Sequence, residues 1–383
     1  MRRTLFEDEH EWFRESVAAF VDRELMPHRE RFREQRYIDR EAWLAAGEAG
    51  FLGLGVPAEY GGSGVEDFRF NAVLMEELAR AGFAYSSSFG IQTDVVAPYL
   101  LRLTTVEQRR RWLPGFCSGE IVTAIGMTEP AAGSDLKAIQ STARRDGDGW
   151  VLSGSKTFIT NGYNADLVVV AARTPDPGGL SLLVVERGME GFSRGAKLDK
   201  LGQHEADTAE LFFDEVRIPA GNLLGEPGRG MGVMMSHLTQ ERISTAVVNV
   251  AHAAVALRLT LEYVGERRAF GRPIGSFQNS RFALAEADAE LDVARVYVDR
   301  CVEAHVAGEL TGVEAAKAKL VSSEVQNRVI DTCLQLHGGY GYVNEYEVAR
   351  SWVDARITRI WAGTNEIMKE VIGRSLGLAE VES

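Results

Sequence analysis

The chain has 383 residues, of which 45% are hydrophobic and 25% charged, and its formal net charge is −13. This is enough material for two or three domains with buried cores, and the acidic balance argues against a general nucleic-acid binder. The three cysteines, Cys117, Cys301 and Cys333, are far apart in the sequence, which excludes a dense disulfide scaffold and disfavours a thiolate metal site, so we expect no metal.

The N-terminal part of the chain predicts a set of helices. Apolar residues recur at helical spacing between residues 13 and 25, and shorter helical patterns follow at 42–50 and 71–81. A capping-box pattern at Thr105 marks the start of another helix. We therefore predict an all-α N-terminal domain over residues 1–119.

The next hundred residues consist of short apolar runs separated by turns, and we predict a β-domain over residues 120–226. Asp146 to Gly149 lies between two strand-like runs and predicts a tight hairpin turn. A second hairpin is predicted from the runs 165–173 and 180–186. Many short strands joined by such turns are typical of an antiparallel barrel or sandwich. A strand–turn–helix G-x-G-x-x-G fingerprint is absent, which disfavours a Rossmann site.

The remaining residues, 227–383, return to helical periodicity. Long patterns cover 240–268, 280–306 and 313–336, and a shorter one covers 366–376. Four helices are the number that an up-and-down bundle requires. No apolar run in the chain approaches the length of a membrane span, and the acidic N-terminus has no signal-peptide core, so we expect a soluble cytoplasmic protein.

Two polar stretches in the β-domain have the groups that a planar, polar cofactor requires. The first is MTEPAAGSD at 127–135, with Thr128 and Ser134, and the second is TFITNG at 157–162, with Phe158 and Thr160. The alternative is a polar rim on a β-domain. Three arginines in ERRAFGRPI could likewise bind a pyrophosphate or form a solvated basic helix end.

These stretches occur in a fixed order with QLHGGYGY, IWAGTNEIMKEVI and the connecting run DTAELFFDEVRIPAGNLLG. Over essentially its whole length the chain resembles the acyl-CoA dehydrogenase family, and it is most similar to the long-chain and isovaleryl branches. The resemblance implies an α+β multidomain fold with an N-terminal all-α domain, a central antiparallel β-barrel and a C-terminal four-helix bundle. It also implies FAD as the cofactor and a homotetramer.

The resemblance assigns cofactor contacts position by position. The residues expected beside the flavin ring are Ile125, Met127, Thr128, Phe158 and Thr160. Those expected to bind the ADP part of a flavin held by a neighbouring subunit are Arg267, Phe270, Gln278, Gln335, Gly338 and Gly339. Thr364 and Glu366 match positions near the adenosine half, and Ser134 matches a position near CoA.

The catalytic base is the main departure from many family members. They carry a glutamate immediately before the glycine of the last motif, where this chain has Ala362 before Gly363. In the long-chain and isovaleryl branches the base comes from the first long bundle helix, and Glu241 matches that position. Considered alone, Glu241 would be interpreted as a first-turn glutamate favoured by the helix dipole. The resemblance also implies that the Ala362 N–H binds the thioester oxygen and that Arg242 orients Glu241 or binds a substrate phosphate.

The implied activity is FAD-dependent α,β-dehydrogenation of an acyl-CoA thioester to a trans-2-enoyl-CoA, with electrons passed to an electron-transfer flavoprotein. Two alternatives stay open. One is an oxidase-type flavoenzyme that reduces oxygen, and the other is a non-catalytic acyl-CoA-binding subunit, suggested by Ala362. The motifs leave open the acyl length and branching, and whether the thioester carrier is CoA or an acyl carrier protein.

Overall fold

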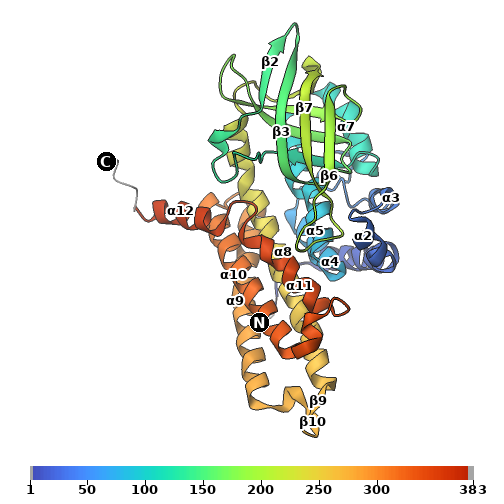
Figure 1. Ribbon diagram of the computed structural model, residues 1–383, viewed down its shortest axis with the longest axis vertical. Coiled ribbons are helices and arrows are strands. Elements are labelled where there is room, and N and C mark those ends of the chain that lie inside the picture. The colour runs from blue at the N-terminus through green and yellow to red at the C-terminus, as the bar shows by residue number, and fades with distance from the viewer. Residues whose placement is uncertain (1–2, 378–383) are drawn as a thin grey trace.

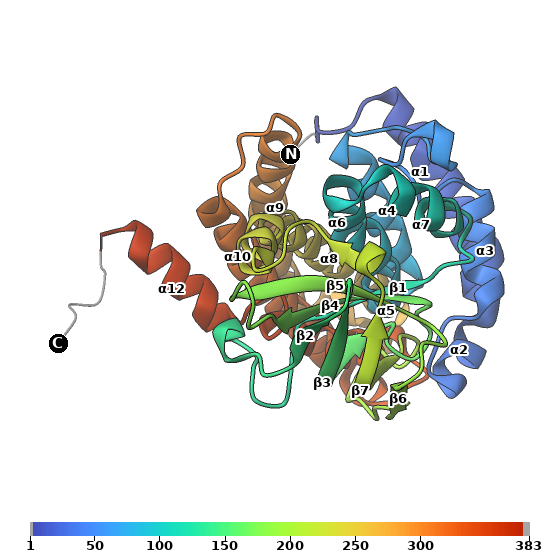
Figure 2. The same ribbon diagram turned by 90° about the horizontal axis from the view of Figure 1, so that it is seen from above.

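The computed structural model describes residues 3–377 and has three parts (Figure 1). A β-domain lies at one end of the molecule, long helices of the C-terminal part extend away from it, and the N-terminal helices lie along one side. Figure 2 shows from above that α8 and α10 lie between the N-terminal helices and α12. The predicted α+β architecture of helical, β and helical parts is confirmed.

The N-terminal part consists of seven α-helices and several shorter helical turns. Its α-helices are α1 (Asp8–Phe20), α2 (Arg29–Gln35), α3 (Arg40–Glu48), α4 (Phe68–Ala81), α5 (Phe83–Gly90), α6 (Ala97–Leu103) and α7 (Val106–Ser118). Two π-helical segments, η1 (Val21–Leu25) and η4 (Ile91–Val96), interrupt them. The predicted capping box is present, because Thr105 and Gln108 bond reciprocally at the start of α7.

Sequence periodicity missed the consecutive helices α5, η4 and α6. All of α5 except Ser87 is buried, so its sequence has no polar face to set against an apolar one. A helix that is buried all round shows no 3.6-residue alternation. The omission matters because these helices form part of the cavity described below.

The β-domain contains eight strands in one sheet, in the order β6-β7-β3-β2-β4-β5-β8, with β1 beside β4. The strands are β1 (Thr123–Gly126), β2 (Thr142–Asp146), β3 (Gly149–Thr160), β4 (Leu167–Arg173), β5 (Leu180–Glu186), β6 (Phe192–Lys197), β7 (Thr208–Ile218) and β8 (Leu223–Leu224). Both predicted hairpins, β2–β3 and β4–β5, are present. Most pairings are antiparallel as predicted, but β1 and β2 each pair with β4 in parallel.

Strand β4 joins the β-domain to the N-terminal helices. One face, with Val168 and Val170, packs inside the β-domain, and the other face, with Leu167 and Val169, packs in a cluster that includes Trp112 of α7. Burial on both faces explains why β4 reads as a continuous apolar run instead of an alternating one.

The C-terminal part has five α-helices where four were predicted. They are α8 (Gly230–Glu266), α9 (Gln278–Val306), α10 (Gly312–His337), α11 (Glu347–Ala355) and α12 (Asn365–Ser375). The prediction missed α11, which packs against α8 and α10. It also placed α12 in the bundle, whereas α12 packs on α10 and points away from the other helices (Figures 1 and 2). The helix predicted at 366–376 is therefore present, but α11 and not α12 packs against both α8 and α10.

Helix α8 is long and apolar enough to cross a membrane on length and composition alone. However, 67% of its most apolar window is buried inside the protein, as expected for a core helix.

The change from helices to strands falls between Ser118 and Thr123, and the change back falls between Leu224 and Gly230. The domain limits proposed from the sequence, 119/120 and 226/227, lie in these two connections.

Candidate functional site

A cavity of about 700 Å³ lies where the three parts of the chain meet. Its wall combines β1 and the loop after it, β3, α5 with η4, α8, and the segment before α12. The structure brings ten of the eighteen residues predicted from the sequence to this wall: Ile125, Met127, Thr128, Ser134, Phe158, Thr160, Glu241, Arg242, Ala362 and Gly363.

The β-domain side of the cavity owes its shape to a bulge in β3. The register of β3 against β7 shifts between Lys156 and Ile159, and Phe158 has a positive φ of 59°. A bulge re-aims the side chains next to it. Phe158 consequently stands 68% exposed at the cavity rim, where its ring is available to another molecule.

A buried ion pair holds the loop after β1 against β3. The Lys156 ammonium lies 2.7 Å from Glu129 Oε1 and donates to the Met127 carbonyl at 3.2 Å. The Thr157 N–H also donates to the Thr128 carbonyl, at 3.0 Å. These contacts fix Met127 and Thr128 relative to Phe158. Sequence reasoning missed Glu129 and Lys156, because an ion pair between residues far apart in the chain has no local pattern.

Glu241 lies in the first third of α8 and faces the cavity. Its carboxyl group is buried, with 9% of the residue exposed. Burial raises the pKa of Glu241 to about 7, while a hydrogen bond from Tyr99 and the charge of Arg242 act in the opposite direction. A carboxylate that still binds protons near neutral pH is suited to general-base catalysis.

The position of Glu241 within α8 rules out the alternative that it is a first-turn glutamate favoured by the helix dipole. Helix α8 begins at Gly230 and not at Gln240, so Glu241 is not in the first turn. The dipole of the helix N-terminus is weak so far along a helix. The earlier start was not predicted because the GRGMG stretch is rich in glycine, which disfavours helix.

The segment before α12 forms part of the cavity wall and has an unusual backbone conformation. Ala362 and Gly363 have positive φ angles of 52° and 85°, and no backbone carbonyl of residues 3–377 accepts a hydrogen bond from the Ala362 N–H. The φ of 85° at Gly363 is one that residues with a Cβ rarely adopt, so the backbone favours glycine there. The Ala362 N–H is thus free to bind an oxygen in the cavity.

A fully buried lysine holds this segment in place. The Lys319 ammonium of α10 donates to the Gly363 carbonyl at 2.7 Å and to Asn365 Oδ1 at 2.9 Å. Burial, with Arg242 nearby, lowers the pKa of Lys319 to about 8. No sequence motif pointed to Lys319.

The rest of the cavity wall is mainly apolar. It is formed by side chains of η4 and α8, which include Ile91, Val95, Met231, Met235, Leu238 and Val248. Sequence analysis assigned none of these residues to a site. Such a wall suits a hydrocarbon chain and keeps water from the carboxyl group of Glu241.

Four other predicted residues line a second hollow at the far end of α8 and α10. They are Arg267, Gln335, Gly338 and Gly339. Phe270 lies at the tip of the β9–β10 turn (Arg268–Ala269 and Arg272–Pro273), 94% exposed and with a φ of 51°. Gln278 begins α9. Figure 1 shows this tip at the opposite end of the long helices from the β-domain. A single chain does not bring these residues to the cavity.

Thr364 and Glu366 lie at the start of α12, next to the cavity but not in its wall. The Thr364 hydroxyl accepts a hydrogen bond from the Ile367 N–H at 3.3 Å and caps the helix. Glu366 is exposed in the first turn, where hydrogen bonding to its own backbone N–H lowers its pKa.

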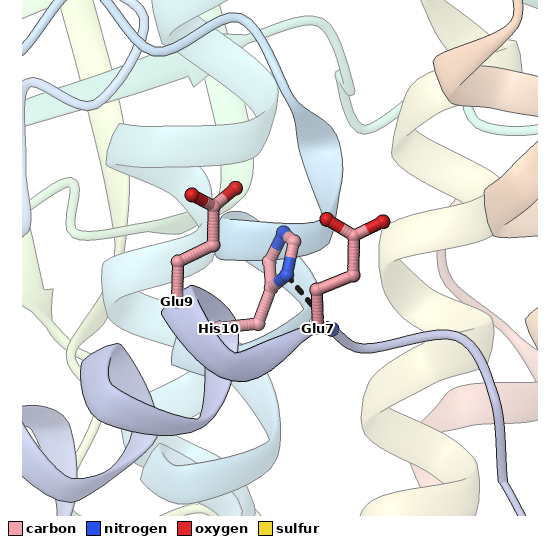
Figure 3. A group of neighbouring side chains, drawn as sticks. All are labelled: Glu7, Glu9 and His10. Carbon is pink, nitrogen blue, oxygen red and sulfur yellow. Dashed lines mark hydrogen bonds between the residues drawn. The ribbon is translucent and has the colours of Figure 1, made fainter.

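Glu7, Glu9 and His10 form a further group of potential ligands at the start of α1 (Figure 3). The Glu7 N–H donates to His10 Nδ1 at 3.1 Å, and His10 Nε2 lies 3.5 Å from Asp67. Arg69 already pairs with Glu7 at 3.2 Å and with Asp67 at 2.7 Å. A guanidinium beside these carboxylates opposes a second cation, and the group is best explained as stabilising the start of the helix.

The three parts of the chain match three family models. The acyl-CoA dehydrogenase N-terminal domain matches residues 7–120, the middle domain 124–216 and the C-terminal domain 228–377. The chain belongs to the acyl-CoA dehydrogenase family. It is therefore an oxidoreductase of a family that depends on FAD, as the sequence resemblance implied.

Individual relatives agree with this assignment. The chain is 42% identical over 380 residues to the mitochondrial long-chain specific acyl-CoA dehydrogenase of Rattus norvegicus, covering 98% of this chain and 88% of the relative. It is 38% identical over 377 residues to the mitochondrial isovaleryl-CoA dehydrogenase of Solanum tuberosum, covering 97% and 91%. Among solved structures, an acyl-CoA dehydrogenase from Geobacillus kaustophilus superposes with a TM-score of 0.94 at 44% identity, covering 97% and 98% of the two chains.

Proposed function

We propose that this enzyme removes the α-proton and a β-hydride from an acyl-CoA thioester to give a trans-2-enoyl-CoA. The observation that carries the proposal is the buried carboxyl group of Glu241 in the wall of the cavity. Ala362, whose N–H has no backbone partner among residues 3–377, and the apolar wall of η4 and α8 line the same space. A base, an oxyanion donor and an apolar channel are the groups that this reaction requires.

The residues of the β-domain side fit the flavin ring of FAD. Phe158 offers an exposed ring at the rim, Thr128 and Thr160 offer hydroxyl groups, and Ile125 and Met127 lie on the fixed segment between them. Trp361, which also lines the cavity, has a buried indole Nε1 with no partner among residues 3–377. When bound, the flavin supplies the acceptor for the hydride.

The chain itself supplies the base and the electrostatic stabilisation. Glu241 takes the α-proton in its carboxylate form. The Ala362 N–H donates to the thioester oxygen as negative charge develops there, and Lys319 keeps that segment in position through the Gly363 carbonyl. The apolar wall excludes water, so the carboxylate is a stronger base than an exposed one. We assign Arg242 to the electrostatic tuning of Glu241, and Ser134 to the CoA end of the substrate.

We further propose FAD binding across subunits, a homotetramer and cytoplasmic localisation, with electron-transfer flavoprotein as the acceptor. In this assembly Arg267, Phe270, Gln278 and the Gln335–Gly339 segment would contact the ADP part of a partner's flavin, with Thr364 and Glu366 near the adenosine. The placement of Arg267, Phe270, Gln278 and the Gln335–Gly339 segment far from the cavity within one chain supports this arrangement.

The test is anaerobic mixing of FAD-loaded enzyme with acyl-CoAs of different length and branching. We expect the flavin absorbance to bleach with at least one of them and an enoyl-CoA to form. Absence of bleaching across the series would leave the non-catalytic acyl-CoA-binding subunit as the better reading. In air, stoichiometric hydrogen peroxide during turnover would indicate the oxidase-type alternative instead of a dehydrogenase.

A further inference from the structure

A buried tyrosine contacts the carboxyl group of Glu241 from the N-terminal part of the chain. The Tyr99 hydroxyl, on α6, donates a hydrogen bond to Glu241 Oε1 at 3.3 Å. Tyr99 is fully buried and does not line the cavity, so it reaches the carboxyl group from behind. Because burial raises the pKa of Tyr99, its hydroxyl keeps the proton that it donates.

The ring of Tyr99 is itself held by a second aromatic side chain of α8. It stacks on His237 with 4.2 Å between ring centroids and 20° between planes. His237 Nδ1 lies 2.8 Å from the Val233 carbonyl in the preceding turn, and burial lowers the pKa of His237, which keeps the ring neutral. Helix α8 therefore carries both the carboxyl group and the ring that orients its donor.

Other charged groups near this contact are few. Arg242 acts on Glu241 from the same helix, and Arg102 of α6 acts on His237. Asp94 of η4 is turned toward Ser244, Asn71 and Thr93, which donate hydrogen bonds to it. Farther along the cavity wall are Asp135, Lys137 and Arg374.

We propose that Tyr99 is a positioning residue, whose hydroxyl and stacked ring hold the Glu241 carboxylate in the orientation that proton removal requires. The inference rests on the proposed function, in which Glu241 is the base. A single hydrogen bond to one carboxylate oxygen leaves the other oxygen for the substrate. It also favours the charged form, so Tyr99 makes more of the base available near neutral pH.

The experiment is the pH profile of anaerobic, single-turnover flavin reduction by the FAD-loaded Tyr99→Phe enzyme with a saturating acyl-CoA. We expect the midpoint of the profile to move upward by roughly 0.5 to 1 pH unit, since a hydrogen bond to a charged group has been removed. Below both midpoints this is a loss of roughly three- to tenfold in rate. The KM should change much less than the rate.

Tyr85→Phe is the matched control. Tyr85 is also fully buried, on α5, but its hydroxyl has no hydrogen-bond partner among residues 3–377. We expect its pH profile to follow that of the unaltered enzyme. An unchanged midpoint in Tyr99→Phe, or an equal shift in both variants, would overturn the proposal while leaving the proposed function intact.

A second measurement does not depend on turnover. Infrared difference spectra between the unaltered protein and Glu241→Gln isolate the carboxyl band of Glu241, which can be titrated directly. In the Tyr99→Phe background, the band should move to higher frequency and titrate at higher pH. If flavin reduction fails with every acyl-CoA even in the unaltered enzyme, the proposed function is wrong. The infrared titration would still decide whether Tyr99 holds the carboxylate.

Discussion

The two ends of α8 differ in how much of a binding site one chain provides. Near its start, the helix faces a cavity that combines residues of all three parts, with Glu241 and Arg242 buried there. Near its end, Arg267 borders an open hollow, and Phe270 is almost entirely exposed at the adjoining turn. The first region buries its charged side chains, whereas the second leaves Arg267 and Phe270 exposed. The difference agrees with our proposal that the chemistry is contained within one chain and that FAD binding needs a partner subunit.

The largest effect that we expect comes from Glu241→Gln. Glutamine keeps the size of the side chain and removes its basicity, so flavin reduction should slow by roughly two or more orders of magnitude, with FAD and acyl-CoA still bound. Stopped-flow flavin reduction measures this. Glu205→Gln is the control, because Glu205 is also buried but lies outside the cavity. Near-normal reduction by Glu241→Gln would exclude it as the base.

The same substitution should stabilise the apoprotein in a pH-dependent way. The pKa of Glu241 rises from 4.5 to about 7 on folding, so the unfolded chain loses this proton first and folding is penalised as pH rises between these values. Relative to the unaltered protein, Glu241→Gln should gain roughly 2–3 kcal/mol of unfolding free energy at pH 8 and nothing at pH 4. Urea titrations at the two pH values measure the difference, and an equal gain at both would contradict this account.

Replacing the lysine behind the cavity wall should have an intermediate effect. Lys319→Met removes the hydrogen bonds to Gly363 and Asn365 while keeping an unbranched apolar side chain. Loss of charge-assisted bonds that fix the Ala362 N–H should slow flavin reduction roughly tenfold. The matched variant is Lys369→Met, on the exposed face of α12. A change in acyl-CoA affinity with no change in the rate would mean that Lys319 shapes only the binding site.

The smallest effect is expected at the other end of α8. Arg267→Gln should weaken FAD binding roughly three- to tenfold and leave monomer stability within about 0.5 kcal/mol, because the group is solvent-accessible in one chain. Flavin titration with light scattering measures affinity and assembly together. Arg258→Gln serves as control, since Arg258 is exposed on the same helix and pairs with Glu262. Tight FAD binding by a monomer would contradict the shared site.

Short sequence patterns predicted the elements that depend only on neighbouring residues. The capping box at Thr105, the hairpin turn at Gly147 and the strand pairs β2–β3 and β4–β5 were read from a few neighbouring residues each. The family, the cofactor class and the ten residues that line the cavity were predicted from sequence motifs and from their order along the chain. Helix α5 was missed because burial on all sides removes the amphipathic signal.

The sequence by itself therefore determined the order of helical, β and helical parts, the family, and Glu241 as the candidate base. Only the tertiary structure decided where Glu241 lies along α8, and that Tyr99, Lys319 and the Glu129–Lys156 pair surround the site. The physical reason is that these contacts join residues far apart in the chain. Burial, which sets the pKa of Glu241, depends on every element packed around it, and no short stretch of sequence carries that information.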